Sequence, residues 1–171
     1  MELKIIDSQQ RLLDFLNDPL NTGNIVDVGD SYLIKPDALY IGVYEGLLLA
    51  GVHEVRAFWH GVVECHAVYN PGFRGEYALE GHRLFCRWLL QNSSFTNSIT
   101  MVPDTTKYGR AIIRLLGATR IGHLDDAYLS NGKSIGVTLY QLTRQQYKEL
   151  SHIRRQLPRP HRDNYSGLFV I

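Results

Sequence analysis

The hydrophobic period of this sequence changes along the chain, and this change constrains the fold more than any other feature. From 38 to 69 apolar residues recur at a period of about two in three runs, the first two separated by Glu45-Gly46, as in strands joined by tight turns. After Asn70-Pro71-Gly72 the period becomes helical as far as about Gln91. These segments predict a mixed α/β (α+β) fold with a central sheet of about six to seven strands flanked by helices. The expected elements are a strand at 3–6, a helix at 9–17 and a loop at 17–30, followed by three strands at 38–44, 47–58 and 62–69. A helix at 77–91, a strand at 99–102, a helix at 106–117 and two strands at 118–124 and 134–143 complete the expected order.

Composition places the chain among ordinary globular proteins. Its 171 residues are 44% hydrophobic and 20% charged, which excludes whole-chain disorder and extended coiled coil. No run approaches the roughly 20 apolar residues of a membrane span, and the N-terminal sequence MELKIIDSQQ lacks the pattern of a signal peptide. Cys65 and Cys86 are too few for a disulfide framework. We therefore expect a cytoplasmic protein without a membrane partner.

The C-terminal segment differs in charge from the rest of the chain. Residues 144–162 carry six basic side chains against one acidic side chain, Glu149. We therefore divide the chain into a domain at 1–143 and a basic helix with a tail at 144–171. A solvated basic helix is favoured over a nucleic-acid contact. The apolar end at 167–171 predicts docking, on the domain itself or on a second copy, so a homo-oligomer or an assembly partner is expected through this tail.

The turn at 70–75 lies between a strand and a helix and is a candidate anion site. Free backbone N–H groups at the start of a helix attract phosphate, and glycines let the backbone approach closely. Arg74 adds a guanidinium that can bind phosphate through two hydrogen bonds. The alternative is that Gly and Arg serve here only to form the turn.

Three segments of this chain resemble the Gcn5-related N-acetyltransferase (GNAT) superfamily. Residues 66–75 are similar to its fourth strand and the start of its pyrophosphate loop, 102–117 to its fifth strand and following helix, and 116–122 to its turn into strand six. The resemblance covers about residues 3–143. It implies a mostly antiparallel sheet with strands four and five splayed, acetyl-CoA in the gap as co-substrate, and acetyl transfer to a primary amine acceptor. It places cofactor contacts at Ala67, Val68, Tyr69, Phe73, Arg74, Gly75, Glu76, Tyr77 and Thr106.

The sequence departs from the family pattern at several of these places. Tyr77 and Leu79 stand where the loop usually has small residues. The tyrosine that protonates the departing thiolate in many members falls at Ile113, and Tyr108 is the nearest phenol. The asparagine expected near the start of the same helix is Thr106. Tyr108 is therefore the candidate proton donor.

Glu64 and His66 are the candidate proton acceptors. The period of a strand places both side chains on one face. An acceptor ammonium must lose a proton before it attacks a thioester, and a carboxylate or an imidazole can take it. Glu64 is the first choice and His66 the second, while a solvated polar strand face is the alternative for each. The backbone N–H of Val68 or Tyr69 would stabilise the oxyanion, as the family resemblance implies.

Zinc binding is not expected. His82 and Cys86 share a helical face at i, i+4, but Cys65 and His66 point to opposite sides of their strand, and no Cys-x-x-Cys or His-Glu-x-x-His spacing occurs.

A second functional class is a GNAT-fold protein that binds or assembles without catalysis. Residues 59–75 also resemble small GNAT-like proteins of tailed bacteriophages, among them head-assembly proteins. This resemblance implies a bacteriophage or virion component, and a host-cytoplasmic location if a phage encodes the chain. The departures at Tyr77 and Leu79 and the basic tail favour it.

Overall fold

The computed structural model describes residues 1–22, 31–130 and 132–152. Within these residues seven strands form one sheet in the order β1-β2-β3-β4-β5-β7-β6. Neighbouring strands run antiparallel except β4 and β5, which are parallel. The predicted mixed fold with a mostly antiparallel sheet is confirmed. The strands are β1 (Glu2–Ile5), β2 (Ala38–Glu45), β3 (Leu48–Trp59), β4 (Val62–Tyr69), β5 (Asn97–Pro103), β6 (Thr119–Ser130) and β7 (Lys133–Thr143).

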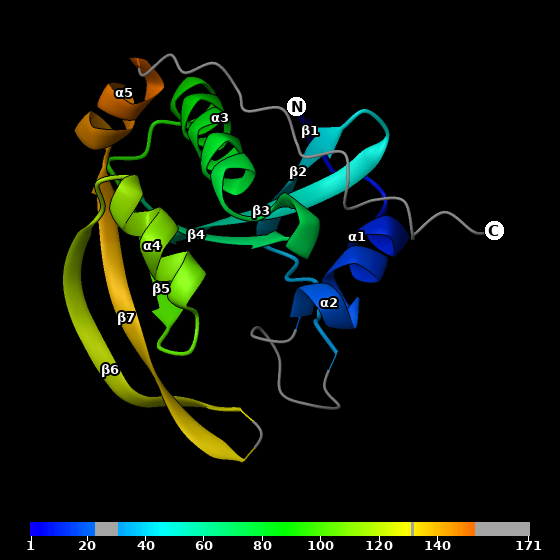
Figure 1. Cartoon of the computed structure of the whole chain (residues 1–171). Helices are drawn as coiled ribbons and strands as arrows, with labels where there is room; N and C mark the ends of the chain where they lie inside the picture. Colours follow the sequence, from blue (N-terminus) through cyan, green and yellow to red (C-terminus); the bar gives the residue numbers. More distant parts are fainter. Residues whose placement is uncertain (23–30, 131, 153–171) are drawn as a thin grey trace.

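Helices cover both faces of this sheet (Figure 1). Their bounds are α1 (Gln9–Leu16), α2 (Pro19–Thr22), α3 (Glu76–Asn92), α4 (Lys107–Leu115) and α5 (Arg144–His152), with a 3₁₀ turn at Pro71–Phe73. Ser8 caps α1 by accepting a hydrogen bond from the N–H of Arg11 at 3.3 Å. None of the helices in the described part of the chain is long and apolar enough to cross a membrane.

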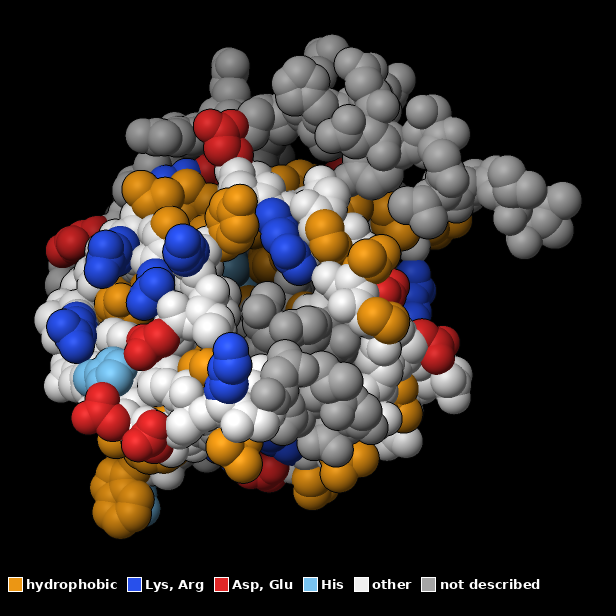
Figure 2. Space-filling view, turned by 60° about the horizontal axis from the view of Figure 1, so that its bottom comes forward, with side chains coloured by type: hydrophobic (Ala, Val, Ile, Leu, Met, Phe, Trp, Pro, Cys, Tyr) orange, Lys and Arg blue, Asp and Glu red, His pale blue; other side chains and the backbone are white. Residues whose placement is uncertain are grey.

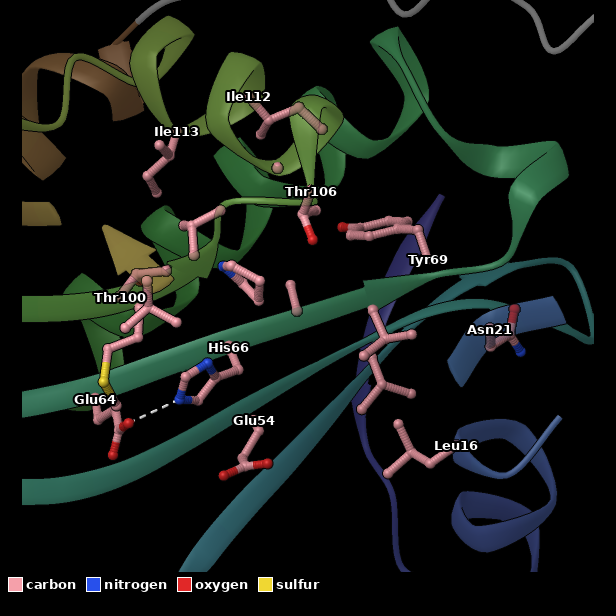
Figure 3. Close-up of a pocket in the computed structure, with 18 of the residues that line it drawn as sticks. Leu16, Asn21, Glu54, Glu64, His66, Tyr69, Thr100, Thr106, Ile112 and Ile113 are labelled. Atoms are coloured by element: carbon pink, nitrogen blue, oxygen red, sulfur yellow. Dashed lines mark hydrogen bonds and ion pairs between the residues drawn. The ribbon is translucent and has the colours of Figure 1, made fainter. Parts of the chain in front are cut away.

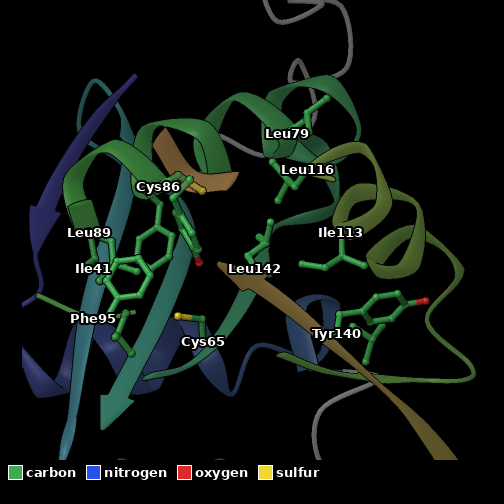
Figure 4. Packing of buried hydrophobic residues seen from close by; sticks show 14 residues of the cluster. Ile41, Cys65, Leu79, Cys86, Leu89, Phe95, Ile113, Leu116, Tyr140 and Leu142 are labelled. Carbon is green, nitrogen blue, oxygen red and sulfur yellow. The ribbon is translucent and has the colours of Figure 1, made fainter. Parts of the chain in front are cut away.

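Strand alternation sorts the buried side chains into two layers. On one face, α1 packs against Tyr40, Tyr44 and Val52. On the other face, α3 and α4 pack against Ile41 and Cys65, and Figure 4 shows this cluster at close range. This cluster contains residues of both helices and of strands β2, β3, β4, β5 and β7. Its packing holds α3 and α4 against the middle of the sheet.

The two parallel strands separate after a short common stretch. β4 and β5 pair where Val62 meets Asn97 and where Glu64 meets Ile99, and they diverge beyond these positions. Past this point the Thr100 hydroxyl donates a hydrogen bond to the Cys65 carbonyl at 2.8 Å. The rest of β4 therefore has an edge that β5 does not cover, and the predicted splay of strands four and five is confirmed.

The last hairpin is longer than the sequence predicts. Its first strand was expected at 118–124, but β6 continues to Ser130 beside β7, and Figure 1 shows the hairpin extending away from the other strands. The reason is a break in register between Leu124 and Tyr128, where Asp126 adopts a positive φ of 51°. Such a bulge interrupts the apolar alternation without ending the pairing. The tail at 158–171 and most of the loop at 17–30 lie outside the described residues.

Tyr69, at the end of β4, lies between two glycines. A Cβ atom at Gly81 of α3 would be 2.1 Å from the Tyr69 hydroxyl oxygen, and one at Gly51 of β3 would be 2.6 Å from its ring. The hydroxyl is hydrogen-bonded to His53 Nε2 at 2.8 Å. Helix α3 can approach the sheet at this point because position 81 has no side chain.

Gly81→Ala is therefore expected to lower the free energy of unfolding by about 1–3 kcal/mol, the usual cost of overpacking. The better helix propensity of alanine, worth about 1 kcal/mol, offsets part of this loss. Urea denaturation of both proteins measures the difference. Gly122→Ala is the control, because a Cβ there meets nothing within 4 Å and should change stability by less than about 0.5 kcal/mol. Equal effects of the two substitutions would contradict this packing.

Candidate functional site

A cavity of about 990 Å³ occupies the place where β4 and β5 separate. Its walls come from both faces of the sheet and from the segment before β2, and Figure 3 shows part of this lining. Polar and charged side chains from different elements converge there: Tyr32, Lys35, Glu54, Arg56, Glu64, His66, Arg74, His82, Thr106 and Tyr108. The gap in the sheet thus joins two halves of one cavity, on the α1 side and on the α4 side.

The uncovered edge of β4 presents backbone N–H groups to this cavity. Backbone polar groups alternate in direction along a strand. The Cys65 carbonyl faces β5, because it accepts from Thr100, and the Asn70 N–H faces β3, because it donates to the Ala50 carbonyl at 3.0 Å. The N–H groups of Ala67 and Tyr69 therefore point into the gap. Of the two expected oxyanion donors, Tyr69 fits this direction, whereas the N–H of Val68 points toward β3.

Glu64 and His66 contact each other, as the strand pattern predicts. His66 Nε2 donates to Glu64 Oε1 at 2.8 Å, and Arg56 Nε donates to the other carboxylate oxygen. These hydrogen bonds, that from His66 first, lower the pKa of Glu64 from 4.5 to about 2. Glu64 is 1% exposed, whereas the His66 side chain is 29% exposed. A carboxylate with so low a pKa is a weak proton acceptor near neutral pH. The His66 ring, with Nε2 donating, keeps a lone pair on Nδ1.

A second carboxylate lies beside this pair and was missed by sequence reasoning. Glu54 on β3 is the register partner of His66, and its carboxylate accepts from the hydroxyl of Tyr32 and from Lys35 Nζ at 2.8 Å. Burial, with the bond to Glu54, raises the pKa of Tyr32 above its ordinary value, so this phenol remains a donor. Finding Glu54 from the sequence would have required the register of β3 against β4. Tyr32 and Lys35 follow the Asn- and Asp-rich loop, whose composition was the available signal.

On the α4 side of the cavity lie two histidines, the buried His53 and the half-buried His82. His53 stacks on Phe85 with ring centres 4.2 Å apart, and His82 stacks on Tyr69 at 5.3 Å. His82 Nδ1 donates to the carbonyl of Ala78 at 2.7 Å. Burial lowers the pKa of His82 from 6.5 to about 4 and that of His53 well below 6.5. Both rings are therefore neutral at pH 7.

The structure places some of the residues expected to contact a cofactor at the cavity and the others outside it. Ala67, Val68, Tyr69, Arg74 and Thr106 line the cavity. Phe73 and Tyr77 instead pack into a core cluster, and the Tyr77 hydroxyl donates to Glu45 at 3.0 Å. Gly75 and Glu76 form the start of α3 outside the cavity lining. The large aromatic residues of the loop thus fill the space under the β2–β3 hairpin, because burial of their rings is more favourable than exposure.

The remaining candidates lie on α4. Tyr108 borders the cavity with 71% of its surface exposed, and Ile113 belongs to the core. Thr106 precedes the helix, and its hydroxyl oxygen is buried without a hydrogen-bond partner among the described residues. Such an unsatisfied atom beside a cavity is a contact point for a polar ligand.

The two cysteines that were considered as metal ligands lie in the hydrophobic core. Cys65 and Cys86 are buried free thiols, and burial raises the pKa of Cys65 to about 12. Among the described residues, no group of three or more His, Cys, Asp or Glu side chains is arranged to hold a metal ion.

Comparison with known proteins shows the family to which this chain belongs. It matches the family described as "Protein of unknown function (DUF2824)" over residues 3–153. The chain belongs to this DUF2824 family. Protein p31 of Acyrthosiphon pisum secondary endosymbiont phage 1 is 36% identical over 146 residues, which are 85% of this chain and 94% of that protein. Protein gp14 of Salmonella phage P22 is 26% identical over 123 residues, 71% of this chain and 78% of gp14. The predicted resemblance to phage proteins is thereby confirmed.

Solved structures identify the fold of this DUF2824 chain. Spermidine N-acetyltransferase from Vibrio cholerae, in complex with CoA and spermine, superposes with a TM-score of 0.69 at 14% identity and covers 85% of this chain and 98% of its own. The protein smu.2055 from Streptococcus mutans gives a TM-score of 0.68 at 10% identity, with 84% and 99% covered. At these identities the likeness shows the fold alone, and it confirms the GNAT fold predicted from the sequence.

Proposed function

We propose that this DUF2824 protein is an acyl-CoA-dependent N-acyltransferase that transfers an acetyl group from acetyl-CoA to a primary amine. One observation carries the proposal. The inward N–H groups of Ala67 and Tyr69 and the ring of His66 meet at the same opening between β4 and β5. An acyl transfer needs N–H donors for a developing oxyanion next to a group that accepts a proton, and this opening supplies both.

The residues around the cavity fit a CoA molecule at its thioester end. A pantetheine chain is an extended amide, and the uncovered edge of β4 offers it the backbone partners that β5 leaves free. The unsatisfied hydroxyl of Thr106 lies on the same side. At the diphosphate end, Arg74 and the N-terminus of α3 favour an anion, while Glu76 in the first helical turn opposes it.

Each polar group then has a role. His66 Nδ1 accepts a proton from the acceptor ammonium, and Glu64 holds the ring through Nε2. Ala67 and Tyr69 donate to the oxyanion. Tyr108 is the phenol of α4 at the cavity and is proposed to return a proton to the departing thiolate. Glu64, first in the sequence-based ranking, acts in this scheme as a positioning residue.

The second candidate function is a binding or assembly protein without catalysis. The observation in its favour is the turn around Arg74, where Phe73 and Tyr77 lie in the core and Glu76 adds negative charge. The phage relatives are compatible with a virion or head-assembly role. Figure 2 shows basic, acidic and apolar side chains intermixed on one face of the molecule, which gives no support to nucleic acid as the partner.

Calorimetric titration with acetyl-CoA separates the two functions, and Arg74→Ala tests the diphosphate end. We expect this substitution to weaken acetyl-CoA binding by about 10- to 100-fold, because it removes a charge-assisted contact worth about 1.5–3 kcal/mol. Glu76→Gln should have the opposite effect and tighten acetyl-CoA binding, since it removes a negative charge that repels the diphosphate.

Arg114→Ala, on an exposed part of α4, is the matched control and should leave the Kd unchanged. Arg74 also donates to the carbonyls of Leu20 and Tyr69, so circular dichroism of the variant checks that the fold is intact. No binding of acetyl-CoA at millimolar concentration would exclude the acyltransferase and leave the assembly protein.

A further inference from the structure

Lys35 places an amine of the chain itself inside the candidate acceptor site. Its ammonium nitrogen is 2.8 Å from Glu54 Oε1, and its side chain, 36% exposed, lines the cavity. The backbone N–H of Lys35 donates to the hydroxyl of Tyr40 at 3.0 Å. This contact fixes the residue just before β2, so that its side chain reaches across the sheet toward β3.

The Lys35 ammonium is bound by the residue that lies directly opposite the proposed proton acceptor. Glu54, which binds it, is the direct register partner of His66 across β3 and β4. Side chains of directly opposed residues on one face have Cβ atoms about 5 Å apart. Figure 3 shows Glu54 and His66 on neighbouring strands of the same cavity. The inward N–H of Ala67 follows His66 in the chain, so amine, base and oxyanion donor form a compact group.

Other lysines lack this combination. Lys4 pairs with Glu2 on β1, Lys133 begins β7, and Lys148 lies on α5. Lys107 borders the cavity at the start of α4, on the opposite side of the gap from Glu54. Lys35 is thus the lysine whose amine is held by a carboxylate, only 7% exposed, at the strand position opposite His66.

We propose that Lys35 is a self-acylation site, which rests on the proposed acyltransferase activity. The ammonium of Lys35 gives one proton to His66 Nδ1, and its free nitrogen attacks the thioester carbonyl carbon of acetyl-CoA. The new C–N bond forms and the C–S bond breaks. Tyr108 gives its proton to the departing thiolate and takes up the second proton of the nitrogen, so the products are N-acetyl-Lys35, CoA and one proton, which His66 releases to solvent.

Acylation of Lys35 also changes the acceptor site. The amide carries no charge, so the ion pair with Glu54 is lost. Glu54 then keeps the hydrogen bond from the Tyr32 hydroxyl but loses the positive charge beside its other oxygen. A buried carboxylate in this state favours the ammonium of a second acceptor, so the class of substrate is a primary alkylamine of lysine-like reach.

The test incubates the full chain with acetyl-CoA and follows the added acetyl groups by intact-mass spectrometry and peptide mapping. We expect one acetyl group at Lys35, formed at a first-order rate that does not depend on protein concentration. Lys35→Arg should abolish it, and His66→Asn should slow it by at least about 100-fold. Lys133→Arg is the matched control and should leave the rate and the site unchanged.

Three results would overturn the proposal in different ways. If acetyl-CoA binds by calorimetry but Lys35 stays unmodified, or is modified no faster than Lys4 and Lys133, self-acylation is wrong while the proposed function stands. If acetyl-CoA does not bind, both are wrong. If Lys35 is acetylated at the same rate in the wild type and in His66→Asn, the acetylation is an uncatalysed chemical reaction. This result would also show that self-acylation is wrong.

Discussion

Substitution of His66 by asparagine is expected to lower the kcat of acetyl transfer by about 10²- to 10⁴-fold, the usual contribution of a general base. An asparagine amide cannot accept the proton of an ammonium, and it is too short to take the place of Nε2 beside Glu64. The substitution therefore removes the proposed proton acceptor and leaves a polar side chain at this position. The measurement is release of free thiol from acetyl-CoA with spermidine or n-hexylamine as acceptor.

The pH dependence distinguishes His66 from Glu64 as the base. With its pKa at about 2, Glu64 is already ionised throughout the neutral range and cannot make the rate depend on pH there. We expect the pH profile of His66→Asn to differ in shape from that of the wild type. His60→Asn, on the exposed β3–β4 turn, is the matched control and should keep both the rate and the profile. An unchanged profile in His66→Asn would contradict its role.

Acidification is expected to destabilise the protein strongly between pH 6.5 and 4. Within this window the unfolded chain binds protons on His82 and His53, while the folded chain, in which burial lowers both pKa values, does not. The contribution of these two histidines to the free energy of unfolding is therefore fully present above pH 6.5 and is lost as the pH falls. For His82 alone the shift to about 4 corresponds to about 3 kcal/mol.

Urea denaturation at several pH values between 7 and 4 measures this loss. His82→Asn should lower stability at pH 7, because its stacking on Tyr69 is lost, but it should flatten the dependence on pH. His60→Asn should leave the slope as it is. Equal slopes in the wild type and in His82→Asn would show that another group controls acid unfolding.

The sequence by itself determined the order of the elements and the local geometry of β4. Period two placed Glu64 and His66 on one face, and Asn70-Pro71-Gly72 marked the change from strand to helix, because both signals depend on residues near each other in the chain. The same local reasoning ended the first strand of the last hairpin at residue 124. It failed there because pairing with β7 carries β6 through the bulge at Asp126.

Tertiary structure alone decided the chemistry of the candidate site. The register of β3 against β4 brings Glu54 beside His66, and Lys35 reaches the same place from a segment distant in sequence. Hydrogen bonds from His66 and Arg56 lower the pKa of Glu64 and so make its carboxylate a weaker proton acceptor. Packing places the side chains of Phe73 and Tyr77 in a core cluster. Each outcome depends on contacts between separate elements, and the local pattern of residues carries no signal for such contacts.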